Sequence, residues 1–385
     1  MKSRQREDGT VPFRVMGAVF CAAQSRFGGD REIGTESSVP GRGGESLTDP
    51  SVVRRAQAVI LGQLAGDALG SVVEFLDRDA IARAYPEGVD LVSSPVWGTL
   101  PGQPTDDSEL ALALGWALAE AGGGGYPDDH VARAYRAWFD SGAFDCGRTM
   151  RTALAAIPTG GCGFAEASRR AASPTSEANG ALMRQSPLAV WGWRLDAGAL
   201  CDAVRRDTTL THPHPVCQAS SCVYVVTLAE LVREGLDARA AYRRALEVAD
   251  ATAAPESVQR ALRDAWTSAP VCDGPHQGHV VIALQNAFHQ LLHATSLQEG
   301  IRATAMLGGD SDTNAAVAGA LLGAAHGIDD VPSPWIEALH ACQPAAHLPG
   351  VRRARPFRYW PPVAMTLAPL LLRSGGAAAN RLAHR

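Results

Sequence analysis

The chain has 385 residues, of which 46% are hydrophobic and 19% are charged, so it holds ample apolar material for a large core. The formal net charge is −5 and there is no long basic run, which gives no support for nucleic-acid binding. We see no apolar run approaching the roughly 20 residues that a membrane span needs, and the eight cysteines, without a CxxC pair, fit reduced thiols in a cytoplasmic protein.

The first 48 residues differ in character from the rest of the chain. Residues 26–46 are rich in glycine, serine and charge, which is typical of a flexible arm or linker. Residues 15–24 are apolar and follow basic residues, as in a signal peptide, but acidic residues and a proline interrupt the approach. We therefore expect an N-terminal arm at 1–48 on a protein that stays in the cytoplasm.

Helical periods dominate from residue 47 onward. Asp49 or Ser51 can cap the first helix, and Pro50 suits its first turn. Alanine is abundant, whereas β-branched runs with period two are hard to find. The expected helices are 47–70, 77–85, 107–121, 128–139, 147–156, 163–172, 196–206, 215–234, 237–251, 255–267, 278–293, 296–305 and 312–326. The sequence thus predicts an all-α bundle, mostly one domain at 49–372, followed by a tail at 373–385.

One of these helices opens with oxygen-bearing side chains. In PTDDSELALALGWALAEAG, residues 104–122, an apolar helix follows Thr105, Asp106, Asp107 and Ser108. The simplest interpretation is a capped helix, in which these oxygens accept hydrogen bonds from the first turn.

The segment LGGDSDTNAAVAGALLGAAHG, residues 307–327, has the same design. Asp310, Asp312 and Thr313 stand at the start of a strongly apolar helix, just after a Gly-Gly pair. Capping is again possible, but a second carboxylate so close to the first is repelled unless something positive lies between them. Together the two helix starts offer four carboxylates and two threonine hydroxyls, a donor set that Mg²⁺, Mn²⁺ and Ca²⁺ prefer. The pair predicts a metal site.

A second possible set of metal ligands lies between these two segments in the sequence. His212, His214, Cys217 and Cys222 follow the order H-x-H-x2-C-x4-C, which offers four Zn²⁺ ligands. The spacing matches no usual finger or ribbon, and the neighbouring prolines favour an ordinary helix start. We interpret His212 instead as a residue beside the ligand or the metal ligands.

Six short segments of the chain, taken in their order along the sequence, form one pattern. They are GQLAGDALGSVVEF at 62–75, PTDDSELAL at 104–112, FDCGRTMRTAL at 144–154, NGALMRQSPLAV at 179–190, THPHP at 211–215 and GIRATAMLGGDSDTNAAVAGALLGAAHG at 300–327. This set resembles the ADP-ribosylglycohydrolase family from about residue 53 to 327. The chain has TDDS where TDDT is common in the family, and NGALMR where a serine often precedes the leucine; neither difference removes a carboxylate.

The resemblance implies an all-α fold with two Mg²⁺ or Mn²⁺ ions in a cleft. Carried over position by position, the implied metal ligands are Thr105, Asp106, Asp107, Asp310, Asp312 and Thr313. Asp106, Asp107 and Glu74 would serve catalysis, with Glu74 lying over the ribose; which aspartate handles the proton stays open. On the residues alone, Glu74 also fits a solvated helix end.

The resemblance also implies a set of substrate-binding residues. Asn179, Gly180 and Met183 would lie beside ADP-ribose, although Met183 on its own fits core packing. Asp145 and Gly147 would face a substrate guanidinium, which a carboxylate binds bidentately, and Asp145 alone fits a helix cap equally well. His212 would lie on the ligand side of the cleft.

The implied reaction is removal of ADP-ribose from a modified protein side chain, with arginine as the default linkage and serine, O-acetyl and nucleic-acid linkages open. An alternative is an immunity protein whose arm, 1–48, also plugs an ADP-ribosyltransferase toxin. A non-catalytic relative is a third possibility, and the crowded carboxylates argue against it.

Overall fold

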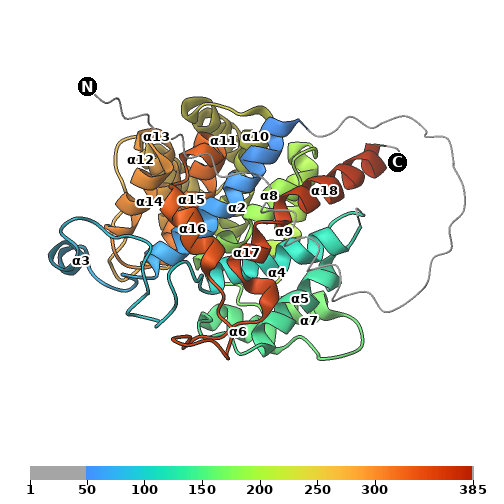
Figure 1. Ribbon diagram of the computed structural model, residues 1–385. Coiled ribbons are helices and arrows are strands. Elements are labelled where there is room, and N and C mark those ends of the chain that lie inside the picture. The colour runs from blue at the N-terminus through green and yellow to red at the C-terminus, as the bar shows by residue number, and fades with distance from the viewer. Residues whose placement is uncertain (1–48, 123, 384–385) are drawn as a thin grey trace, which may run out of the picture. The chain divides into compact units, whose positions relative to one another are not determined.

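The computed structural model describes residues 49–122 and 124–383, so the predicted arm and the toxin-binding role tied to it lie outside the described residues. Regular structure in these residues is helical, which confirms the all-α prediction; one isolated bridge joins Ala178 and His279. The α-helices, labelled in Figure 1, are α2 (Pro50–Gly70), α3 (Arg78–Ala84), α4 (Asp106–Glu120), α5 (Asp128–Asp140), α6 (Arg148–Ala155), α7 (Phe164–Ala171), α8 (Ser186–Trp191), α9 (Ala197–Thr208), α10 (Pro215–Glu234), α11 (Ala238–Ala251), α12 (Glu256–Ala265), α13 (Val280–His293), α14 (Leu297–Ala305), α15 (Ser311–His326), α16 (Ser333–Ala341), α17 (Pro361–Ala364) and α18 (Leu367–Ala383). Three short 3₁₀ helices in the described residues are η2 (Asn179–Arg184), η3 (Ile328–Asp330) and η4 (Phe357–Tyr359).

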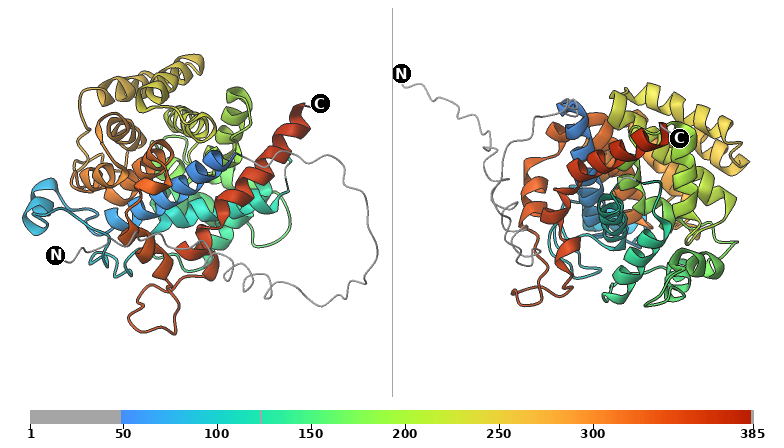
Figure 2. Two further views of the ribbon diagram at one scale, coloured as in Figure 1. Left: turned by 45° about the horizontal axis from the view of Figure 1, so that its top comes forward. Right: turned by 90° about the vertical axis from the view of Figure 1, so that its right-hand side faces the viewer.

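Helices α2 and α15 form an antiparallel pair in the interior, and they lie side by side in Figures 1 and 2. Small residues at every fourth position let the two backbones touch. A Cβ atom added to Gly62 would lie 2.1 Å from the carbonyl oxygen of Gly319, and one added to Gly66 would lie 2.0 Å from that of Ala315. Glycine in a helix costs about 1 kcal/mol relative to alanine. Here only glycine allows the close approach that brings the C-terminal end of α2 to the N-terminal start of α15.

Helix α10 is the one described helix that is long and apolar enough to cross a membrane. The expectation that no apolar run approaches that length overlooked it. Most of α10 is buried against other helices, among them α9 and α11, so it is a core helix of the fold.

The predicted helices are present, and each end lies within three residues of its predicted position. Of the two N-caps predicted for α2, Asp49 and Ser51, the structure shows Asp49. Several elements were not predicted, namely η2, α8, η3, α16, η4, α17 and α18. Helix α18 continues past residue 373, where a tail was expected. The glycines there permit close packing, since a Cβ on Gly375 would lie 1.6 Å from the carbonyl oxygen of Trp191.

Candidate metal centre and its cleft

The starts of α4 and α15 meet beside the last turns of α2. Thr105 is the N-cap of α4 and Asp310 is the N-cap of α15, and neither side chain caps its own helix. The capping interpretation therefore fails for Thr105 and for Asp310. Their side-chain oxygens are directed to other partners, as a metal site requires.

A residue that the sequence analysis missed performs the capping of α4. Asp67 of α2 accepts hydrogen bonds at Oδ1 from the Thr105 backbone N–H at 2.9 Å and from the Thr105 hydroxyl at 2.8 Å. Its Oδ2 accepts from the Ser108 N–H at 2.8 Å. A carboxylate among the apolar residues of the last two turns of α2 was the signal that could have identified it. Asp67 positions α4 from outside that helix, and Asp107 Oδ1 has no hydrogen-bond partner in the described residues.

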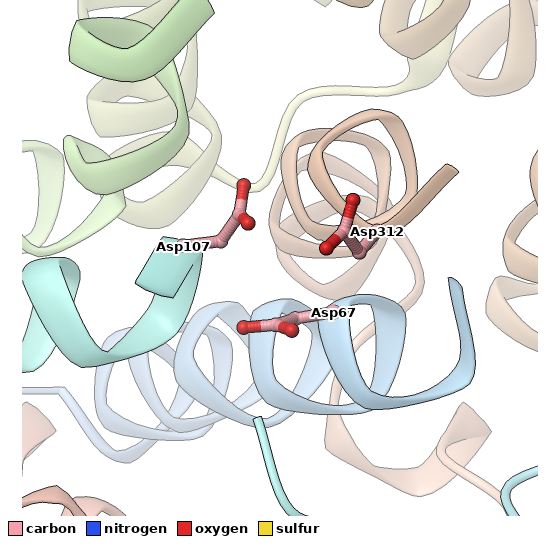
Figure 3. A group of neighbouring side chains, drawn as sticks. All are labelled: Asp67, Asp107 and Asp312. Carbon is pink, nitrogen blue, oxygen red and sulfur yellow. The ribbon is translucent and has the colours of Figure 1, made fainter. Parts of the chain in front are cut away.

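The Thr105 hydroxyl lies among three carboxylates. Besides its contact with Asp67, its Oγ1 lies 3.2 Å from Asp107 Oδ2 and 3.2 Å from Asp312 Oδ2. One hydroxyl has one hydrogen to donate, so it cannot satisfy three carboxylates at once. Figure 3 shows the carboxyl groups of Asp67, Asp107 and Asp312 converging from α2, α4 and α15. Oxygens this close require protons or a shared cation.

Burial increases the free-energy cost of ionising carboxyl groups that lie so close together. The pKa values of Asp106, Asp107 and Asp312 are raised well above the ordinary range, first by burial and then by neighbouring carboxylates. Burial also raises the pKa of Asp67 to about 6, although hydrogen bonds from Ser108 and Thr105 oppose the shift. Each of these groups would ionise more readily beside a cation. The two buried arginines of the described residues form ion pairs with other carboxylates, Arg184 with Asp207 and Arg355 with Glu109.

Two groups of carboxylates are close enough to hold a cation each. One comprises Asp67, Asp107 and Asp312, and the other comprises Glu74, Asp145 and Asp312. In addition, Asp107 Oδ1 is buried without a hydrogen-bond partner in the described residues. An orphaned carboxylate oxygen and an all-oxygen donor set fit hard divalent ions. Asp312 belongs to both groups, so it is placed to bridge two ions.

The cleft in front of these carboxylates has a volume of about 340 Å³. All predicted site residues except Thr105 line it, and Thr105 lies fully buried behind it. The structure therefore brings together side chains that are up to some 240 residues apart in the chain, from Glu74 to Thr313. It also adds lining residues that were not predicted, including Phe75, Arg148 and Ser176.

Glu74 is buried at the cleft wall rather than solvated at a helix end, with 3% of its surface exposed. Trp97 Nε1 donates a hydrogen bond to Glu74 Oε2. Burial raises the pKa of Glu74 to about 8, and repulsion from Asp310 and Asp145 adds to the shift. The next residue, Phe75, is 55% exposed and has a positive φ of 64°, with its N–H bonded to Gly309 O. This turn ties Glu74 to the Gly-Gly pair before α15.

Asn179 and Asp145 form two further walls. Asn179 Nδ2 donates to Asp310 Oδ2 at 2.7 Å, and its backbone N–H bonds to Gly278 O at 3.0 Å. Asp145 is not a helix cap, because α6 has Gly147 as its N-cap. Burial raises the pKa of Asp145, while a hydrogen bond with Asp106 opposes the shift. A carboxyl pair of this kind holds a proton or a cation between its oxygens.

His212 is buried and lines the cleft, whereas the zinc alternative is contradicted by the geometry. His214 caps α10 through Nδ1, and Cys217 donates to the carbonyl groups of Ser176 and Ala178. Cys222 donates instead to Cys201 O. The four residues of that alternative therefore serve separate partners.

Comparison with known proteins agrees with this geometry. A family model described as ADP-ribosylglycohydrolase matches residues 48–356. The chain is 32% identical over 298 residues to ADP-ribosyl-[dinitrogen reductase] glycohydrolase of Rhodospirillum rubrum, covering 76% of this chain and 92% of that protein. It is 26% identical over 303 residues to ADP-ribosylarginine hydrolase Tri1 of Pseudomonas putida (strain GB-1), covering 76% of each. A solved structure titled ADP-ribosylglycohydrolase-related protein complex shares the fold, with a TM-score of 0.63 and 23% identity over 84% of this chain and 99% of that one.

Proposed function

The chain belongs to the ADP-ribosylglycohydrolase family, and on that premise we propose that it removes ADP-ribose from modified arginine side chains of proteins. The proposal rests on the cluster of three buried carboxylates around the Thr105 hydroxyl. Carboxylates this close together are stable only when protons or cations neutralise them. The relatives named as ADP-ribosylarginine hydrolases support the arginine linkage.

Two Mg²⁺ or Mn²⁺ ions are the cofactors that fit the donor set. The residues that would hold them are Thr105, Asp106, Asp107, Asp310, Asp312 and Thr313. When bound, such ions orient ribose hydroxyls and lower the pKa of a coordinated water.

The substrate enters with its guanidinium toward Asp145. This carboxyl group lies in the same cleft as Asn179 and Gly180, which would form the wall for ADP-ribose, and the buried Met183 lines that cleft too. A carboxylate recognises a guanidinium through two parallel hydrogen bonds. The partner is therefore an ADP-ribosylated protein that presents its modified residue to the cleft.

Hydrolysis breaks the bond between C1″ of the ribose and the guanidine nitrogen, adds the water oxygen to C1″ and returns a proton to that nitrogen. Positive charge develops on the ribose ring during this step, and carboxylates beside the ring stabilise it. Asp106 and Asp107 would exchange the protons, and burial together with neighbouring carboxylates raises both pKa values well above the ordinary range. Glu74, held by Trp97, covers the ribose.

We further propose that the reaction takes place in the cytoplasm. The seven cysteines in the described residues are all free thiols, and five of them are buried. Reduced thiols of this kind are usual in compartments where disulfides do not persist.

The test is release of free ADP-ribose from matched protein substrates that carry ADP-ribose on arginine or on serine. We expect release from the arginine-linked substrate at a rate at least tenfold above that from the serine-linked one. Faster release from serine would overturn the proposed linkage, and release from neither would overturn the proposed hydrolase.

A further inference from the structure

Arg184, the last residue of η2, lies fully buried behind the wall of the cleft. Its Nε donates to Asp207 Oδ2 at 3.2 Å, and its Nη2 donates to the Asp207 backbone oxygen at 3.0 Å. Asp207 Oδ1 accepts from the hydroxyls of Tyr126 and Tyr135, and the Tyr135 ring centroid lies 4.5 Å from the guanidinium carbon. These contacts fix the orientation of the guanidinium group.

The remaining guanidinium nitrogen points toward the cleft. Arg184 Nη1 donates to Thr211 Oγ1 at 2.8 Å, and Thr211 Oγ1 lies 2.8 Å from His212 Nδ1. Arginine has no acceptor, so the threonine oxygen accepts from Arg184 and keeps its own hydrogen. Within the described residues these are the two side-chain partners of Thr211 Oγ1. His212 Nδ1 is therefore the acceptor that the described side chains offer to the hydroxyl hydrogen of Thr211.

A nitrogen that accepts a hydrogen bond carries no proton. Because Nδ1 of His212 accepts, a neutral His212 must carry its hydrogen on Nε2. Burial, reinforced by the charge of Arg184, lowers the pKa of His212 to about 3, so the ring is neutral near pH 7. His212 Nε2 is buried and has no hydrogen-bond partner in the described part of the chain, although the ring lines the cleft.

We propose that Arg184 and Thr211 are positioning residues that fix the proton of His212 on Nε2, so that the cleft wall presents one N–H donor to an oxygen of ADP-ribose. The identity of this ligand rests on the proposed function; the placement of the proton does not. A protonated Nε2 has no lone pair in the ring plane, so His212 can neither ligate a cation nor accept a proton at that atom. The cleft is thereby divided between oxygen ligands at one wall and a neutral donor at the other.

The proton can be read directly by nitrogen NMR of the full chain labelled with ¹⁵N at histidine. The His212 signals are assigned by their absence in His212→Gln. In wild type we expect a non-protonated Nδ1 and a protonated Nε2. Thr211→Val removes the donor to Nδ1, and we expect a mixture of tautomers together with roughly tenfold weaker binding of ADP-ribose. Thr211→Ser, which restores the hydroxyl, should return both properties to those of wild type.

Thr208→Val is the matched control for damage to the buried network. The Thr208 side chain accepts from Gln185 in the same network and donates to Val204 O. The contact of Thr208 with His212 is made by its backbone oxygen, which accepts from the His212 backbone N–H at 2.8 Å and is kept in Thr208→Val. This variant should leave the His212 signals unchanged. Comparing ADP-ribose with ADP identifies the acceptor: a loss in Thr211→Val with both ligands places the phosphate oxygens at Nε2, and a loss with ADP-ribose alone places a ribose hydroxyl there.

A proton on Nδ1 in wild type, or identical tautomers in wild type and Thr211→Val, would overturn the proposal. The tautomer is measured without ligand, so it is independent of the proposed function. If wild type shows the expected tautomer but does not bind ADP-ribose, the proposed ligand is wrong while the placement of the proton stands.

Discussion

Asp67 accepts two hydrogen bonds from Thr105, one from the backbone N–H at 2.9 Å and one from the hydroxyl at 2.8 Å. The two residues belong to different helices, so a side chain in the middle of the core orients the first turn of α4. This relationship explains why Thr105, although it is the N-cap, makes no capping bond of its own. It also keeps the Thr105 hydroxyl and the Asp107 carboxyl group beside Asp312.

Replacing Asp67 by alanine should destabilise the protein more than the loss of an ordinary cap. The backbone N–H groups of Thr105 and Ser108 would lose their acceptor inside the core, and each buried unsatisfied donor costs about 1–3 kcal/mol. The control is Asp77→Ala, which removes an exposed N-cap of α3 and costs about 1 kcal/mol. Chemical denaturation should show a larger loss for Asp67→Ala by about 2 kcal/mol or more. Equal losses would mean that Asp67 is only a local cap.

The contact between α2 and α15 should not tolerate a single methyl group. A Cβ on Gly66 would lie 2.0 Å from the carbonyl oxygen of Ala315, which neither backbone can relieve without separating the helices. We expect Gly66→Ala to lower the free energy of unfolding by about 3 kcal/mol or more. Gly160→Ala, at a site with nothing within 4 Å, should change it by about 0.5 kcal/mol at most. Similar stabilities of the two variants would contradict the close packing.

Without cations, the protein should lose stability as the pH rises. Burial raises the pKa of Asp67 from 3.8 to about 6 and that of Glu74 from 4.5 to about 8. Between the ordinary and the raised values the folded protein holds protons that the unfolded chain has released. The free energy of unfolding is therefore highest below about pH 4 with respect to these groups, and it falls as the pH rises to about 8.

Melting temperatures measured across this pH range in chelator and in excess Mg²⁺ test that expectation. Mg²⁺ should remove the fall, because its carboxylate ligands are deprotonated when it binds. A melting temperature that rises with pH in chelator would show that the carboxylates are stabilised by something other than protons or cations.

Trp97 should support activity through the hydrogen bond that its indole N–H donates to Glu74. Trp97→Phe removes the donor to Glu74, and we expect activity to fall about tenfold, because an unrestrained Glu74 covers the ribose less well. Trp116→Phe is the matched control, since the Trp116 indole donates to the Arg358 backbone oxygen away from the cleft. Unchanged kcat/KM in Trp97→Phe would show that Glu74 does not depend on this bond.

Local sequence patterns were sufficient to predict most helices and the two oxygen-rich helix starts, whereas the other cleft residues were predicted from the family resemblance. The oxygen-rich starts at 104–108 and 310–313 pointed to one place because each combines a helix signal with repelling carboxylates. The structure brings these starts together and places Glu74, Asn179 and His212 around them. Their roles in binding and catalysis stay predictions.

What the sequence did not predict depends on distant partners. Asp67 became a cap only because α2 crosses behind α4, and Trp97 reaches Glu74 from a loop without regular structure. Helix α8 has only six residues, too few for a helical period to show, and it forms in contact with α4, α10 and α18. In the sequence, the glycines of α18 suggest a flexible tail. In the structure, the backbone of Trp191 packs against Gly375. Packing between remote segments decides all four cases.

The most direct test of the central claim is release of ADP-ribose from an arginine-ADP-ribosylated protein by wild type and by Asp312→Asn, each in Mg²⁺ and in chelator. Asp312 belongs to both candidate cation groups, so its loss should disable both. We expect release by wild type in Mg²⁺, no release in chelator, and a reduction of about hundredfold or more in Asp312→Asn. Asp329→Asn, at a side chain that is 88% exposed, should behave as wild type. Undiminished release in chelator, or by Asp312→Asn, would contradict the claim that the carboxylate cluster is the metal-dependent catalytic centre.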